Sequence, residues 1–334
     1  METTLTGGLA TGIGSLPHRD AVEAAEWVLA ELPDLPAVPS LPRRHPAELM
    51  LAQASVGIPG ITIDRDGKLK VKPRAVDPAV SIEVDLGQEA FGGLRAFAQV
   101  AAGRTGPVKW QVTGPLTLAL ELRRHGVPAK AAFAVAANAV QAHLRAVHHL
   151  LSEAMPSATQ VVLLDEPDVA GLHAASFPLA PDAALDILSG CLATLGGSAI
   201  TGIHCCATEV DLSSLLAAGP SVLSIPVHSG VVAAAGYLAT FLDNGGWIAW
   251  GVVPTDRPIA TSADRYWREL SALWCELVQA GCDAATLRRR CIVTPACGLG
   301  LYELDQAGGV LAEVRDIAER VIGQAVATRL SLGA

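Results

Sequence analysis

Three residues whose side chains can bind zinc lie just after two apolar stretches of the chain. His204 and Cys206 follow one stretch, and Cys297 follows another one closer to the C-terminus. Zn²⁺ takes imidazole and thiolate ligands, and a catalytic zinc keeps one position open for substrate. Residues two apart on an extended strand project to the same side, so His204 and Cys206 pair while Cys205 points away. The sequence therefore predicts a zinc site formed by His204, Cys206 and Cys297.

Each of these residues also has an ordinary structural explanation. A free cysteine is often a small buried hydrophobe, and His204 could be a core histidine with satisfied hydrogen bonds. The chain holds seven cysteines, including the adjacent Cys205 and Cys206. That pattern is typical of a reducing compartment, where clustered Cys and His indicate metal binding or catalysis rather than disulfides. The combined set favours the metal site.

Polar residues after other apolar stretches are candidates for binding a substrate. Asp165 and Glu166 stand directly before a proline. Such a carboxylate pair can hold a substrate ammonium, act as an acid or base, or cap the next helix. Ser15 stands in a Gly-Ser turn, where its hydroxyl and nearby N–H groups could bind a carboxylate, although a plain helix cap explains it equally well. We take Ser15, Asp165 and Glu166 as candidate substrate-binding residues.

These residues need a scaffold that brings distant strand ends together. Short apolar runs alternate with longer Ala/Leu-rich amphipathic segments, which is typical of βα units around a parallel sheet. Strands are predicted at residues 9–14, 109–113, 160–164, 199–203, 222–225, 247–252 and 291–294, with a further strand at 36–39 or 61–64. Helices are predicted at residues 20–32, 129–153, 181–195, 229–242, 262–280 and 306–329.

About eight such strands close a barrel, so the sequence predicts an α/β fold, a single (β/α)8 TIM-type barrel over residues 1–334. The chemistry of such a barrel lies at the C-terminal ends of its strands, where the candidate residues stand. The irregular segment 41–97, with mixed Pro, Gly and charge, is predicted to be an insertion that covers one rim. Two modest domains are the alternative for a chain of this length.

The composition argues against several function classes. The formal charge is −9, and Lys and Arg are scattered, so no basic field would attract nucleic acid. The first residues do not combine a cationic stretch with an apolar one, and no uninterrupted apolar run is long enough to span a bilayer. We therefore expect a soluble, cytoplasmic protein with neither a nucleic acid nor a membrane as partner.

The chain resembles the C-terminal catalytic barrel of cobalamin-independent methionine synthase, and more closely the single-barrel, actinobacterial-type members of that family. The resemblance covers most of the chain but not segment 41–97. It is carried by an ordered set of motifs, namely Thr11-Gly-Ile-Gly-Ser-Leu-Pro-His18, Val112-Thr-Gly-Pro-Leu-Thr117, Leu164-Asp-Glu-Pro167, His204-Cys-Cys206, Leu223-Ser-Ile225 and Thr294-Pro-Ala-Cys-Gly-Leu299.

The resemblance implies a barrel of the methionine synthase and uroporphyrinogen decarboxylase-like superfamily that transfers a methyl group to the sulfur of homocysteine. It implies that His204, Cys206 and Cys297 are the zinc ligands, that Ser15 contacts the amino-acid carboxylate and that Asp165 contacts the amino group. Zinc lowers the pKa of a thiol and holds it as the nucleophilic thiolate. The predicted site would then serve methionine biosynthesis.

Two positions depart from the family pattern. The family's glutamate ligand falls at Pro226, so either His228 substitutes for it or three protein ligands hold the zinc. The family histidine that helps to protonate the folate leaving group falls near Asp256. We take His228 and Asp256 as the candidate catalytic residues at these positions.

The second departure bears on the methyl donor. Expelling a folate amine needs a proton donor, whereas a methylated corrinoid leaves without one. The sequence therefore favours methylcobalamin over 5-methyltetrahydrofolate as the donor, with a corrinoid protein as a candidate partner.

Three other functions compete with this one. The chain could transfer alkyl groups to a different small thiol, such as coenzyme M. A metal-free decarboxylase of the uroporphyrinogen type shares the barrel but has no use for three metal ligands together. The missing glutamate also leaves open a non-catalytic homologue that binds zinc or a corrinoid.

Overall fold

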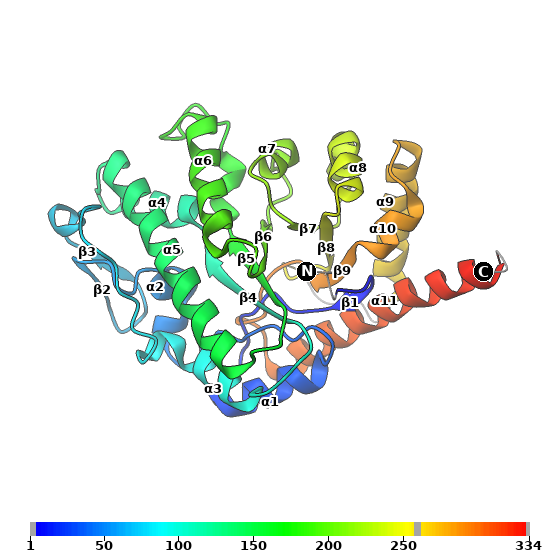
Figure 1. Ribbon diagram of the computed structural model, residues 1–334, viewed down its shortest axis with the longest axis horizontal. Helices are drawn as coiled ribbons and strands as arrows, with labels where there is room; N and C mark the ends of the chain where they lie inside the picture. Colours follow the sequence, from blue (N-terminus) through cyan, green and yellow to red (C-terminus); the bar gives the residue numbers. More distant parts are fainter. Residues whose placement is uncertain (1–4, 257–261, 332–334) are drawn as a thin grey trace.

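A curled, wholly parallel sheet of seven strands forms the centre of the computed structural model, which describes residues 5–256 and 262–331 (Figure 1). The strands lie in the order β1-β9-β8-β7-β6-β5-β4. Their bounds are β1 Leu9–Ala10, β4 Val108–Thr113, β5 Gln160–Asp165, β6 Ile200–His204, β7 Val222–Pro226, β8 Trp247–Val253 and β9 Cys291–Pro295. All seven predicted strands are present, which confirms the parallel α/β architecture.

The two edge strands of the sheet are joined by an extended segment at residues 36–40. A parallel bridge pairs Ala37 with Lys109 of β4, and a second one pairs Ser40 with Ser15, just beyond β1. Prolines 36 and 39 lack the N–H groups that a regular ladder requires, so the segment makes only isolated bridges. It occupies the eighth position of the ring, and the chain is therefore a (β/α)8 TIM-type barrel.

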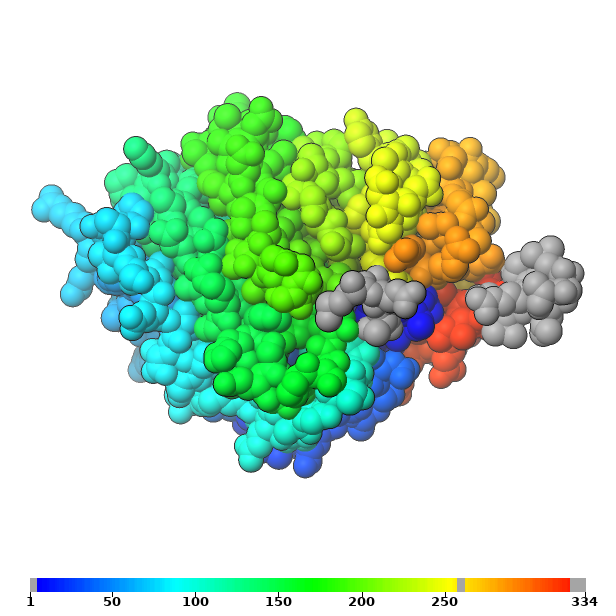
Figure 2. All heavy atoms as spheres, viewed as in Figure 1, coloured from blue at the N-terminus to red at the C-terminus, as the bar shows by residue number. Residues whose placement is uncertain are grey.

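Of the two predicted positions for a further strand, residues 36–39 take the eighth place in the barrel through isolated bridges, whereas residues 61–63 form a regular strand that lies outside the barrel. Strand β2, Ile61–Ile63, pairs antiparallel with β3, Leu69–Val71, in a separate hairpin. This hairpin lies away from the barrel and protrudes at one end of the molecule (Figure 1, Figure 2).

Helices cover the outside of the barrel (Figure 1). The α-helices are α1 Ala21–Glu31, α2 Met50–Ala54, α3 Gly92–Val100, α4 Pro115–Arg124, α5 Ala129–Ala154, α6 Pro181–Leu192, α7 Leu212–Ala217, α8 Ala235–Asp243, α9 Asp264–Gln279, α10 Ala284–Arg289 and α11 Leu304–Ser331. All six predicted helices are found, although 3-10 turns, η5 Ala193–Leu195 and η6 Ser229–Ala234, take one end of two of them. Within the described part of the chain, no helix has both the length and the apolar character needed to cross a bilayer.

Two apolar clusters stabilise the barrel. The larger one lies between the sheet and the helices, and a smaller one fills the barrel interior towards the N-terminal ends of the strands. Because strand side chains alternate, the residues of β5 at 161 and 163 face this interior cluster. The interior cluster consists of Leu5, Leu9, Leu35, Val161, Leu163, Val222, Trp247, Ala249 and Ile292. The opposite end of the interior is lined by polar residues, described below.

Only part of segment 41–97 projects from the barrel, namely the hairpin of β2 and β3. The rest folds back over the barrel. It begins with a 3-10 turn, η1 Pro46–Glu48, and helix α2. Buried Glu48 accepts hydrogen bonds from the backbone N–H groups of Leu41, at 2.8 Å, and Gly93, at 3.4 Å, and forms an ion pair with Arg44 at 2.5 Å. One carboxylate therefore joins both ends of the segment and places η1 and α2 beside the polar end of the barrel.

Candidate metal centre and cavity

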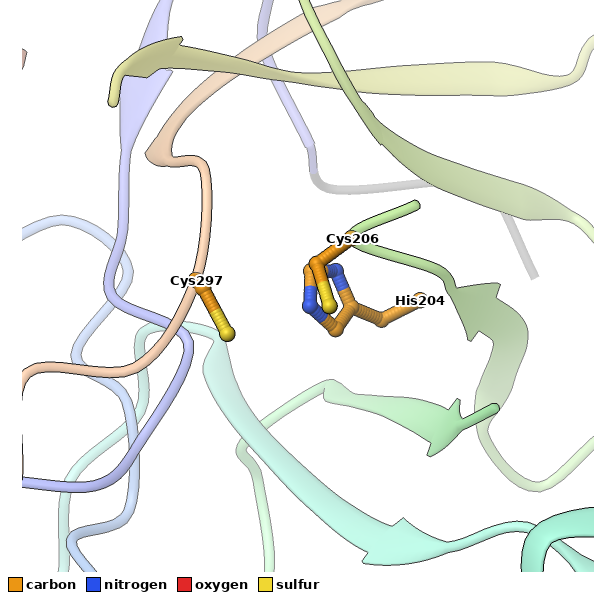
Figure 3. A group of neighbouring side chains, drawn as sticks. All are labelled: His204, Cys206 and Cys297. Carbon is orange, nitrogen blue, oxygen red and sulfur yellow. The ribbon is translucent and has the colours of Figure 1, made fainter. Parts of the chain in front are cut away.

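Three side chains with soft or borderline donor atoms meet at the C-terminal end of the barrel. His204 is the last residue of β6, Cys206 lies two residues further on, and Cys297 lies in the loop that follows β9. Their ligand atoms all lie within 4.8 Å of one another. Figure 3 shows the Cys297 side chain pointing toward His204 and Cys206 from its own separate segment. Residues more than 90 positions apart in the sequence are thus brought together because parallel strands end at one rim.

The imidazole of His204 is held in a fixed orientation by the neighbouring strand. Its Nδ1 lies 2.9 Å from Ser224 Oγ, and β6 and β7 pair these two residues in register. A hydrogen on Nδ1 that is donated to Ser224 leaves the lone pair on Nε2. His204 Nε2 is buried and has no hydrogen-bond partner among the described residues. A buried nitrogen without a partner is costly, and a metal ion would satisfy it.

The two thiols interact directly with each other. A hydrogen bond from Cys297 lowers the pKa of Cys206, and the same bond, together with burial, raises the pKa of Cys297 to about 12. Cys205 lies in the large apolar cluster, and burial raises its pKa to about 11. One imidazole and two neighbouring thiols form a donor set that suits Zn²⁺, and Cys205 is excluded from it by its direction.

A cavity of about 370 Å³ opens beside the three donors. The barrel and segment 41–97 both contribute to its walls. It is lined by Ile13, Ser15, Ser40, Pro42, Glu48, Leu49, Met50, Gln53, Gln111, Val112, Thr113, Asp165, Pro167, His204, Cys206, Cys297, Gly298, Gly300 and Leu301. The cavity is large enough for an amino acid and combines apolar walls with a few polar groups, as small-molecule sites do.

Ser15 and Asp165, two of the candidate substrate-binding residues, both line this cavity. Ser15 Oγ accepts a hydrogen bond from the N–H of Gly300 at 3.2 Å, which leaves its hydroxyl hydrogen able to donate into the cavity. Asp165 Oδ1 is shielded from solvent and has no partner among the described residues. Desolvation raises the pKa of Asp165, although the charges of His204 and Lys109 oppose this. An incoming ammonium would satisfy the carboxylate.

Glu166 does not line the cavity, and its prediction as a substrate-binding residue is not supported by its position. Its carboxylate accepts hydrogen bonds at the start of α4, from the N–H groups of Leu116 and Thr117 at 2.8 Å and from Thr117 Oγ1 at 2.6 Å. Burial raises its pKa to about 7, and these hydrogen bonds oppose the rise. Because strand neighbours face opposite sides, Asp165 points inward and Glu166 points to the helix layer. Glu166 thus binds the start of α4, which precedes it in the chain, and its side chain makes no capping hydrogen bond at the 3-10 turn that follows it, η4 Pro167–Gly171.

His228 and Asp256 lie apart from the metal donors. His228 precedes η6, outside both the donor group and the cavity lining; its Nε2 is buried without a partner among the described residues, and burial lowers its pKa. Asp256 is exposed and does not line the cavity. Pro226 is the buried last residue of β7. Within the described part of the chain, no fourth protein ligand adjoins the three, which favours a three-ligand site over substitution by His228.

Two polar cavity residues were not singled out from the sequence. Lys109 and Gln111 alternate on β4 and face the barrel interior, with Lys109 almost fully buried beneath the cavity and Gln111 in its wall. Lys109 Nζ donates to the carbonyl of Ile13 and to Gln111 Oε1 at 2.7 Å. The sequence contains a signal that could have identified them, because a lysine and a glutamine interrupt the apolar pattern of a strand that is otherwise buried.

No protein-family model and no curated protein sequence matches the chain. Among solved structures, it is similar to a B12-independent methionine synthase from Shewanella sp. W3-18-1, determined in complex with selenomethionine. The likeness covers 96% of this chain and 99% of that one, with a TM-score of 0.62 and 12% sequence identity. At this identity the likeness establishes the fold. The chain thus shares a TIM-type barrel over nearly its whole length with a protein of the family that its motifs resemble.

Proposed function

We propose that this protein is a zinc-dependent methyltransferase that transfers a methyl group to the thiol of homocysteine and forms methionine. The observation that carries the proposal is the convergence of His204, Cys206 and Cys297 on a cavity that also holds Ser15 and Asp165. A thiol-activating donor set and groups suited to an amino acid therefore share one space.

The three donors would bind Zn²⁺, with Ser224 orienting the imidazole of His204. Bound zinc lowers the pKa of a substrate thiol, so that its sulfur is present as the thiolate. Three protein ligands leave one coordination position, which is the number that a catalytic zinc site requires. The absence of the family glutamate at Pro226 is compatible with such a site.

Asp165 and Ser15 would orient the amino acid. The unpartnered carboxylate of Asp165 accepts hydrogen bonds from the substrate ammonium, and the hydroxyl of Ser15 donates to the substrate carboxylate. With both ends of the amino acid fixed, the side-chain sulfur is directed to one place in the cavity. Such positioning lowers the entropic part of the barrier to methyl transfer.

For the donor, we propose a methylcorrinoid such as methylcobalamin in preference to 5-methyltetrahydrofolate. The folate amine must be protonated as it leaves, and Asp256, which stands near the family histidine, is exposed and outside the cavity lining. A methylcorrinoid releases its methyl group without needing such a proton donor. A corrinoid protein would be the corresponding partner.

The first experiment is the metal content of protein purified without chelator, beside the Cys297→Ser variant. We expect about one zinc per chain, lost in the variant. Cys275→Ser is the matched control, because Cys275 is an exposed thiol outside the donor group and its substitution leaves zinc bound. Zinc that is absent, or unaffected by Cys297→Ser, would contradict the thiolate mechanism.

The second experiment is a screen for methionine formation from homocysteine with methylcobalamin and with 5-methyltetrahydrofolate. Turnover with methylcobalamin supports the donor assignment, and turnover with the folate alone reverses it. Methyl transfer to another small thiol, such as coenzyme M, in preference to homocysteine would contradict the assignment of homocysteine as the acceptor. Tight zinc without turnover for any donor would indicate a non-catalytic binding protein.

A further inference from the structure

Lys109 lies inside the barrel, directly beneath the cavity. It is only 1% exposed, and its ammonium donates to the carbonyl of Ile13 and to Gln111 Oε1. Removing a charged amine from water is costly unless it is hydrogen-bonded and near an opposite charge. Asp165 supplies that charge. The ammonium and its acceptors therefore hold one another in a fixed arrangement.

This arrangement decides which end of the Gln111 amide is available to a ligand. An ammonium group can only donate hydrogen bonds, so the amide atom that faces Lys109 must be the carbonyl oxygen. The amide nitrogen is therefore turned away from Lys109. Gln111 Nε2 donates to no acceptor among the described residues, although the side chain lines the cavity.

The backbone at Gly14 sets the place of this amide. A Cβ atom at position 14 would come within 1.7 Å of Gln111 Nε2, and Gly14 has a φ of 141°, which L side chains rarely adopt. The amide therefore packs against the backbone directly before Ser15. The Gln111 amide and the Ser15 hydroxyl, both hydrogen-bond donors, thus belong to the same wall of the cavity.

We propose that Gln111, oriented by Lys109, is a specificity residue that donates its amide N–H to the carboxylate of the amino-acid substrate. The inference rests on the proposed function, since it assigns a further contact to the same substrate. A carboxylate accepts hydrogen bonds and an ammonium does not, so the nitrogen end of Gln111 selects the acid group. Asp165 repels a carboxylate, and the two residues together fix the direction of the amino acid.

The test measures binding of three probes by calorimetry. The probes are L-methionine, 4-(methylthio)butyrate, which lacks the amine, and 3-(methylthio)propylamine, which lacks the carboxylate. Gln111→Glu keeps side-chain length and an oxygen for Lys109 but replaces the N–H donors with a second oxygen. Losing a hydrogen bond to a charged group predicts about 10- to 100-fold weaker binding of both acids. Binding of the amine and the zinc content are expected to hold or, for the amine, to improve.

Gln53→Glu is the matched control for adding a negative charge to the cavity. Gln53 lines the same cavity, but its Nε2 already donates to the carbonyl of Ala90 at 2.6 Å. We expect this variant to bind the acids clearly better than Gln111→Glu does. Equal weakening by both variants would overturn the proposal, because the effect would then be one of charge alone.

Lys109→Met tests the orienting role. It frees the Gln111 amide to turn, so both acids are expected to bind more weakly while the amine binds at least as well. An equal loss of all three probes would show that Lys109 only supports the fold and would overturn its orienting role.

The outcomes separate this inference from the proposed function. Acid binding that does not change in Gln111→Glu overturns the inference and leaves methyl transfer to homocysteine untouched. Acid binding that depends on Gln111, in a protein that methylates no homocysteine, supports the inference and removes the proposed function. A wild-type protein that binds neither acid contradicts both.

Discussion

The two ends of the barrel interior are built from the same strands but differ in chemistry. Towards the N-terminal ends, the interior is filled by an apolar cluster that includes Val161 and Leu163 of β5. Towards the C-terminal ends, polar atoms such as Asp165 Oδ1, His204 Nε2 and Thr294 Oγ1 are buried without partners among the described residues. Buried polar atoms without partners cost free energy. The comparison indicates that one end stabilises the fold and the other is prepared for ligands.

The largest expected effect comes from the apolar end. Leu163→Ala removes a side chain that is 2% exposed inside the barrel, so it should lower the free energy of unfolding by about 2–5 kcal/mol. Urea unfolding measures this loss. At temperatures where the variant stays folded, its zinc content should equal that of the wild type. Loss of zinc without loss of stability would contradict the division between the two ends.

Glu166, which follows β5 and points to the helix layer, should make the free energy of unfolding depend on pH. Burial raises the pKa of its carboxyl to about 7 in the folded protein, from 4.5 for a glutamate exposed to water, as in the unfolded chain. Between these values the folded state keeps a proton that the unfolded state loses, so the free energy of unfolding falls as pH rises and is level above about pH 7. Over this pH range, the titration of Glu166 lowers the free energy of unfolding by roughly 3 kcal/mol.

The measurement is urea unfolding from about pH 5 to pH 8 for the wild type and Glu166→Gln, since the amide stays neutral throughout. The variant should show a flatter pH dependence than the wild type. Glu269→Gln, at an exposed ion pair with Arg265, serves as the control and should follow the wild type. Parallel curves for the wild type and Glu166→Gln would rule out this assignment.

Asp165, one residue away, should affect binding instead of stability. Asp165→Asn removes the charge that would hold the substrate ammonium, which predicts a loss of about 10- to 100-fold in kcat/KM for homocysteine. The free energy of unfolding should change less than in Leu163→Ala, because relieving a buried carboxylate oxygen without a partner offsets the loss of the charge that faces the buried Lys109 ammonium. A strongly destabilised variant would show that Asp165 belongs with the structural end.

Substituting Ser224 tests whether zinc binding at the polar end depends on the hydrogen bond that orients His204. Ser224→Ala removes the hydrogen-bond partner of His204 Nδ1, so zinc affinity should fall by about 10- to 100-fold in a chelator competition. Ser221→Ala, at an exposed position just before β7, is the matched control and should bind zinc like the wild type. Unchanged affinity in Ser224→Ala would mean that the imidazole is oriented by packing alone.

Much of the fold could be predicted because it depends on local pattern. Apolar runs of strand length alternating with amphipathic segments are enough to predict β4 to β9 and the longer helices between them, α5, α6, α8 and α9. The shorter helices α2, α3, α4, α7 and α10 were not predicted. Helix α2 has only five residues, α7 and α10 have six each, and a Pro-Leu-Thr start does not distinguish α4 from a loop. Segment 36–40 could be proposed but not chosen, since only the bridges to Lys109 and Ser15 distinguish it from 61–64.

The sequence by itself determined the three candidate zinc ligands, because period-two alternation fixes the direction of His204 and Cys206 and parallel strands end at one rim. Tertiary structure decided which buried polar groups have partners. Glu166 accepts hydrogen bonds at the start of α4, and Lys109 donates hydrogen bonds to Gln111 and Ile13. Asp165 Oδ1 and His204 Nε2 have no hydrogen-bond partner among the described residues. The direction of a side chain is a local property. Its partner is set by the packing of segments far apart in the chain, so it appears only in the folded barrel.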